Sequence, residues 1–200
     1  MKNTTRDLVT LAVFGALWGL VEISLGSVFH AINLPMTGLS LSAIGLMIAL
    51  IGRAFVPKRG STLFIGVIAA VLKMFSIGAI IIGPMIAILA EAILAELVLS
   101  LFDKPSRLAF VCAAMLGALW SLVQPFVTGL LLFGRDLFSI WLDTLDFGAR
   151  LFGLGGQAEL WIVLALVLVY LVVGGAAGWF AWRLSGLVMD RLGQRSPQAA

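Results

Sequence analysis

The sequence has little charge, and this scarcity excludes most soluble folds. Only 12% of its 200 residues are charged, whereas 62% are hydrophobic. A soluble domain carries roughly twice that share of charge, about 25%. The net charge of +3 comes from few side chains, so it reports on membrane topology and does not indicate a nucleic-acid partner. We therefore expect one domain, residues 1–200, embedded as a multi-pass protein in the lipid bilayer of the cell membrane.

Cysteine and histidine are almost absent. Cys112 is the only cysteine, which excludes a disulfide within the chain, and His30 is the only histidine, which excludes a multi-histidine metal site. The chain also lacks the G-x-S-x-G motif of many hydrolases and the H-E-x-x-H motif of zinc peptidases. We therefore predict no metal, no cofactor and no enzymatic activity.

Long apolar runs take the place of charge. The first run, residues 8–29, is long enough to cross a hydrocarbon core of about 30 Å. Charged turns and segments rich in proline and glycine separate it from the later runs. The pattern predicts an all-α bundle of about six transmembrane helices, at residues 8–29, 40–54, 61–77, 82–102, 108–133 and 160–184.

The basic residues fix the predicted orientation of this bundle. In a six-span layout most of them fall on one side of the membrane, Arg135 and Arg150 fall on the other, and Lys73 lies within it. The majority side holds Lys2, Arg6, Arg53, Lys58, Arg59, Lys104, Arg107, Arg183, Arg191 and Arg195. Because cytoplasmic loops carry an excess of lysine and arginine, both termini are predicted to be cytoplasmic.

Residues 135–156, between spans five and six, have a pattern of their own. Polar side chains recur there every three or four residues, at Asp136, Ser139, Asp143, Asp146 and Arg150. This period predicts an amphipathic helix at the outer membrane interface. It is either a connector, or a lid over an outward-facing site with Gly148 and residues 153–156 as hinges.

Three ionisable residues fall inside the predicted spans at similar depth. Glu22, Lys73 and Glu91 lie roughly 16–21 Å from the cytoplasmic helix ends and form a predicted buried polar layer. Lys73 and Glu91 lie in adjacent predicted helices, within reach of one another. They serve either as a structural ion pair or as part of a substrate site, which intramembrane charges often mark.

Further polar and aromatic residues are candidates for the same site. Gln124 is predicted in the outer half of span five, one turn beyond Trp120. Trp120 and Tyr170 are placed to stack on a ligand ring, although packing in the core or against lipid is the alternative for both. A stripe of small residues in span one, formed by Ala12, Ala16 and Gly19, predicts close packing against another helix.

The chain resembles the substrate-binding S components of energy-coupling factor (ECF) vitamin transporters. The resemblance lies in its size, its six predicted spans, its broken first loop HAINLPMTGLS and the Ala12-x-x-x-Ala16 motif. It implies capture of a vitamin or vitamin precursor from outside, with a T-type membrane subunit and two cytoplasmic ATPases as partners. Because Lys2 stands where metal-importing relatives carry a histidine, cobalt or nickel is not the expected substrate.

The resemblance also assigns roles to residues. Ala12, Ala16 and Gly19 would dock on the T-type subunit. The substrate pocket would be built by the first loop and spans four to six, with the polar layer contributing Lys73, so that the candidates are Asn33, Lys73, Glu91, Trp120, Gln124 and Tyr170. Two other classes compete with this interpretation. One is a small carrier that uses Glu22 or Glu91 as a proton or ion site, and the other is a structural membrane subunit.

Overall fold

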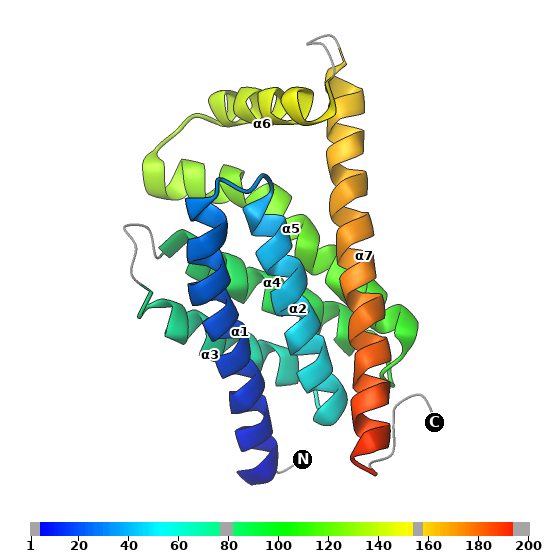
Figure 1. The fold of residues 1–200 in the computed structure, drawn as a ribbon. Coiled ribbons are helices and arrows are strands. Elements are labelled where there is room, and N and C mark those ends of the chain that lie inside the picture. The colour runs from blue at the N-terminus through cyan, green and yellow to red at the C-terminus, as the bar shows by residue number, and fades with distance from the viewer. Residues whose placement is uncertain (1–4, 77–81, 154–157, 194–200) are drawn as a thin grey trace.

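The computed structural model describes residues 5–76, 82–153 and 158–193, and these residues form seven helices without a strand among them. The helices are α1 (Thr5–Ala31), α2 (Thr37–Phe55), α3 (Ser61–Lys73), α4 (Ile82–Ser100), α5 (Arg107–Phe133), α6 (Leu137–Phe152) and α7 (Glu159–Arg191). Six of them pack side by side, and α6 lies across one end of the bundle (Figure 1). The prediction of an all-α bundle is confirmed.

Five of these helices, α1, α2, α4, α5 and α7, are long and apolar enough to cross a membrane, so the protein is a multi-pass membrane protein. The third predicted span is shorter than expected. Helix α3 has 13 residues, which cover about 20 Å, and it ends at Lys73 in a turn. The last residue of the predicted span, 77, lies outside the described residues.

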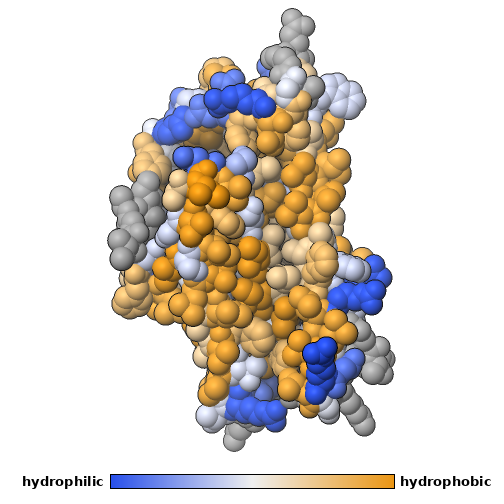
Figure 2. All heavy atoms as spheres, viewed as in Figure 1, coloured by the Kyte–Doolittle hydropathy of each residue, from blue (hydrophilic) through white to orange (hydrophobic). Residues whose placement is uncertain are grey.

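The ends of the bundle differ in chemistry. The start of α1 and the end of α7 lie at one end, whereas α6 and the connection between α1 and α2 lie at the other (Figure 1). Apolar side chains cover the middle of the visible face, and hydrophilic ones gather at both ends (Figure 2). Termini at one end are what an even number of crossings requires. That this end is cytoplasmic stays a prediction from the basic residues.

Small residues bring the helices into close contact. A Cβ added to Gly178 of α7 would lie 2.4 Å from the carbonyl oxygen of Phe110 in α5, so no larger side chain fits. A Cβ at Gly19 of α1 would lie 2.8 Å from Cβ of Leu72 in α3. Gly19 is therefore buried in the α1–α3 interface, and only Ala12 and Ala16, which are half-buried, stay open to an external partner.

A buried carboxylate ties three helices together at the end of the bundle where α1 begins. Glu96 of α4 accepts hydrogen bonds from the backbone N–H groups of Gly60 and Thr62, at 2.7 and 3.0 Å. Its Oε1 also lies 3.4 Å from Nη1 of Arg53 in α2. The side chain thus satisfies backbone donors that the first turn of α3 leaves without an intrahelical acceptor.

The predicted amphipathic helix is present as α6 and is packed on the bundle. Asp136 caps it by accepting a hydrogen bond from the N–H of Ser139, at 2.8 Å. Gly148 is buried in the middle of α6, and a Cβ there would lie 2.3 Å from Cγ2 of Ile162 in α7. Gly148 therefore allows α6 to pack closely on α7. Gly153, at a φ of 67°, ends the helix, and residues 154–157 lie outside the described part.

The topology predicts which positions a membrane-impermeant thiol reagent reaches. In a Cys112→Ala background, Lys58→Cys and Lys104→Cys should be labelled only from the cytoplasm, and Ser139→Cys only from outside. Labelling of intact cells and of inverted vesicles measures this. Labelling of Ser139→Cys from the cytoplasm would overturn the assigned orientation.

Candidate functional site

A cavity of about 170 Å³ lies among the first five helices, and the predicted buried polar layer lines it. We call it the central cavity. Its wall is formed by Glu22, Thr37, Gly38, Leu41, Ser42, Lys73, Pro84, Ala87, Ile88, Glu91, Ser121 and Gln124. These residues come from the second half of α1, the starts of α2 and α4, the end of α3 and the middle of α5, which places the cavity toward the α6 end of the bundle.

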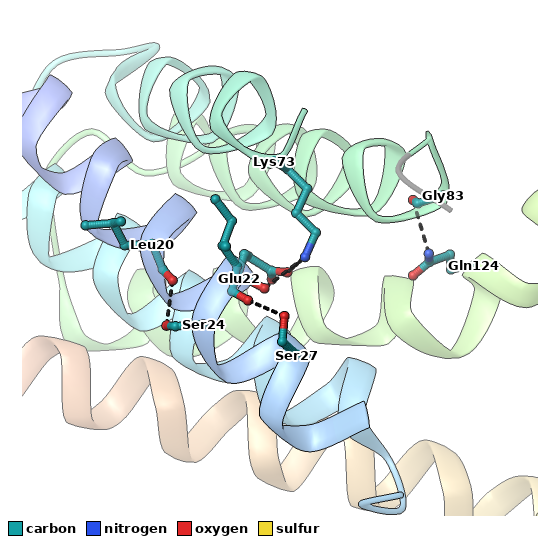
Figure 3. A network of polar contacts seen from close by, with 8 residues as sticks. Leu20, Glu22, Ser24, Ser27, Lys73, Gly83 and Gln124 are labelled. Carbon is teal, nitrogen blue, oxygen red and sulfur yellow. Dashed lines mark hydrogen bonds and ion pairs between the residues drawn. The ribbon is translucent and has the colours of Figure 1, made fainter. Parts of the chain in front are cut away.

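Lys73 is held by α1. Its Nζ donates a 2.8 Å hydrogen bond to the backbone carbonyl of Glu22 and lies 3.4 Å from Oε2 of the same residue (Figure 3). A Cβ at Gly26, one turn beyond Glu22, would lie 3.5 Å from this nitrogen, an ordinary van der Waals distance, so the ammonium group lies close to α1. Of the two alternatives for Lys73 and Glu91, the structural ion pair is not formed, because the last residue of α3 turns toward α1 and pairs with Glu22.

Glu91 lies across the cavity among hydroxyl groups. It is only 3% exposed, and its Oε1 accepts a 3.2 Å hydrogen bond from Oγ of Ser121. The hydroxyl of Ser42 is close to the same carboxyl group, although it makes no hydrogen bond of normal geometry. None of the ion pairs between described residues includes Glu91.

Two residues of α5 complete this side of the central cavity. Gln124 donates from Nε2 to the carbonyl of Gly83 at the start of α4, at 3.2 Å, and this contact fixes its amide (Figure 3). Pro125 follows inside the helix and has no N–H to donate. The carbonyl of Ser121, four residues earlier, therefore loses its usual intrahelical donor. Ser121 thus contributes its hydroxyl group to the site, and its carbonyl lacks the usual donor four residues later.

A second cavity, of about 250 Å³, lies beneath α6 and is called the outer cavity. It is bounded by Ser121, Leu122, Pro125, Arg135, Ile140, Asp143, Thr144, Phe147 and Tyr170. Ser121 lines both cavities, which makes them neighbours. At the outer cavity, Nη2 of Arg135 lies 2.6 Å from Oδ2 of Asp143, in an ion pair that is largely exposed.

The predicted substrate residues fall into three groups. Lys73, Glu91 and Gln124 line the central cavity, and Tyr170 lines the outer one. Asn33 is exposed in the α1–α2 connection at a φ of 50°, and it lines neither cavity. Trp120 lines neither as well, and its buried indole N–H has no hydrogen-bond partner among the described residues.

Sequence reasoning missed the hydroxyl groups of the site. Ser42, Ser121 and Thr37 line the central cavity. Only Ser121 carried a usable signal, because a proline four residues later releases its carbonyl inside a spanning helix. Ser42 and Thr37 are indistinguishable in the sequence from hydroxyl residues that bond back to their own helix.

Comparison of the chain with protein-family models, with curated proteins and with solved structures finds no match. The resemblance to ECF S components therefore rests on the architecture and on the residues quoted from the sequence.

The observed pairing predicts which charge removals destabilise the fold. Glu22→Gln should leave Lys73 buried and unpaired, at a cost of about 3–5 kcal/mol in the free energy of unfolding. Adding Lys73→Met should restore much of this stability. Glu91→Gln strands no cation and should cost less than about 1.5 kcal/mol.

Unfolding of the purified variants in detergent, by heat or by added SDS, measures these differences. The opposite pattern, in which Glu91→Gln is the damaging change and Lys73→Met rescues it, would show that Lys73 pairs with Glu91 and not with Glu22.

Proposed function

We propose that this protein is a membrane substrate-binding subunit, the S component of an ECF-type importer, that captures a small molecule from outside the cell. The observation that carries the proposal is the central cavity, which places buried charged and hydroxyl side chains from five helices around one space. Polar groups are costly inside a bilayer, and they persist mainly where they bind a ligand or one another.

The position of the central cavity fits access from the outer side. Thr37 and Gly38, at the beginning of α2, line it, and the outer cavity adjoins it at Ser121 beneath α6. The apolar face of α6 packs on the bundle through Ile140 and Leu145. In this proposal α6 covers the outer cavity, and the ligand passes from there toward Glu91. The 170 Å³ volume suits a compact ligand, because pockets for drug-sized molecules measure about 300–1,000 Å³.

The partner surface in the proposal is the outward face of α1. Val13 and Leu20 are about three-fifths exposed there, and Ala12 and Ala16 lie at the edge of the same face. Small side chains beside a broad apolar surface allow the backbone of another helix to approach closely. A T-type membrane subunit, coupled to two cytoplasmic ATPases, is the partner that the resemblance implies. This part of the proposal rests on the resemblance and on the exposed face together.

A small ion-coupled carrier is the second candidate, and one observation favours it. Glu91 is a buried carboxylate without a cation partner among the described residues, and such groups serve as proton sites in carriers. The two functions separate by energy source. Uptake by an S component requires ATP hydrolysis by partner subunits, whereas a carrier works alone in proteoliposomes with an ion gradient.

The docking role of α1 is testable with a bulky substitution. Ala16→Trp should abolish uptake and co-purification with a T-type subunit, because the indole ring holds the partner helix away. Small molecules retained by the isolated protein, measured by mass spectrometry, and its melting temperature should stay unchanged. Val172→Trp, on a part of α7 that is 60% exposed, is the matched control and should leave assembly intact. Normal assembly of a well-folded Ala16→Trp protein would contradict the docking role.

A further inference from the structure

One ionisable group of the central cavity has no partner of opposite charge among the described residues. The charged groups that line it are Glu22, Lys73 and Glu91. Lys73 is engaged by both the carbonyl and the carboxylate of Glu22. Glu22 and Lys73 therefore neutralise one another, and Glu91 is left without an ion pair among the described residues.

The surroundings of Glu91 do not supply a balancing cation. Ser121 donates one hydrogen bond to it, and Ser42 lies close by. Hydroxyl donors stabilise a carboxylate but carry no charge, and a carboxylate away from water is stable only when it is well paired. A proton or a positively charged ligand can supply the missing positive charge at this position.

Besides Glu91, the other groups on this wall of the central cavity are suited to a ligand that donates hydrogen bonds. The carboxyl group of Glu91 and the hydroxyl groups of Ser42 and Ser121 lie on this wall, and one N–H of Gln124 is used by the carbonyl of Gly83. The wall near Glu91 thus presents oxygen atoms that can accept hydrogen bonds from a ligand. Leu41, Ala87 and Ile88 supply an apolar surface beside them. Acceptors next to apolar side chains match an ammonium or amidinium group attached to a compact apolar or aromatic body.

An inorganic cation fits this arrangement less well. A metal ion of the hard type needs six or more oxygen ligands at short distance, and among the described residues no cluster of three or more metal-ligating side chains occurs. The cavity volume, about 170 Å³, is also several times the roughly 30 Å³ that one water molecule occupies in the liquid. A single small ion would leave most of this space to other molecules.

We propose that the ligand of the central cavity is a small organic cation whose positively charged nitrogen is bound by Glu91, opposite the Lys73–Glu22 pair. This rests on the proposed function, since it names the substrate class of the same site. The Lys73–Glu22 pair acts in this arrangement as a neutral wall. A neutral pair repels anions less strongly than a single unpaired carboxylate does. The preference for cations is therefore assigned to Glu91.

The test uses three probes that share one ring and differ in charge at pH 7. They are 3-(aminomethyl)pyridine, a cation; 3-(hydroxymethyl)pyridine, a neutral molecule; and pyridine-3-carboxylate, an anion. Binding to the purified full-length protein in detergent is measured by calorimetry and by the shift in melting temperature. The ammonium probe should bind about ten-fold more tightly than either of the others, which corresponds to one charge-assisted contact.

Variants assign that preference to Glu91. Glu91→Gln should reduce the difference between the ammonium and alcohol probes to about three-fold or less, and Glu91→Asp should retain most of it. Asp190→Asn is the matched control, because it removes one carboxylate from an exposed position of α7, and it should keep the wild-type preference. A melting temperature for each variant establishes that it is folded.

Several outcomes would overturn the inference. Equal affinities, no binding of the ammonium probe at about 10 mM, or a preference that survives Glu91→Gln would each do so. Stabilisation that follows sodium ions, when sodium chloride is exchanged for potassium chloride, would assign the site to an inorganic ion. A neutral or anionic molecule retained by the purified protein would overturn the cation while leaving the proposed import function intact. The proposed import function itself would be contradicted if the protein took up substrate without ATPase partners.

Discussion

The ion pair between Lys73 and Glu22 is the interaction on which the rest of the site depends. In a low-dielectric interior a charged group must be paired, and Lys73 satisfies this requirement with both the carbonyl and the carboxylate of Glu22. The pair joins the end of α3 to α1, so the short third helix is fixed at the depth of the central cavity. Because Lys73 is bound to Glu22, Glu91 faces the cavity beside hydroxyl groups and without a cation partner among the described residues. The ligand chemistry proposed for the site depends on this arrangement.

Close packing and buried caps position this arrangement. Gly15 and Gly19 let α3 approach α1, and Gly174 and Gly178 let α7 approach α5. At the other end of α3, the carboxylate of Glu96 takes the place of a helix cap and holds α2, α3 and α4 together. Two carboxylates of α4 thus have different roles. Glu96 binds backbone N–H groups and Arg53, whereas Glu91, five residues earlier, forms no ion pair among the described residues.

Much of the fold could be predicted from the sequence, because apolar runs of about 20 residues and the side preference of basic residues are strong signals. Polar residues that recur every three or four positions over residues 136–150 are an equally strong signal, and they predicted α6. The site was predicted only in part. Glu22, Lys73 and Glu91 were expected near one level and Gln124 in the outer half of span five, and all four line one cavity. Their pairing was not predictable, because depth along a helix does not say toward which neighbour a long lysine side chain turns.

The role of small residues was equally ambiguous in the sequence. Gly19 was expected to face a partner and is buried against Leu72, while Gly148 was a candidate hinge and fits against Ile162. A glycine in a helix marks close approach, yet the sequence does not identify the approaching group.

A crystal structure of the protein with 3-(aminomethyl)pyridine would test the central claim most directly. We predict the ammonium nitrogen within hydrogen-bond distance of Glu91 and Lys73 still on Glu22. Lys73 turned onto Glu91, with the probe elsewhere, would contradict the account.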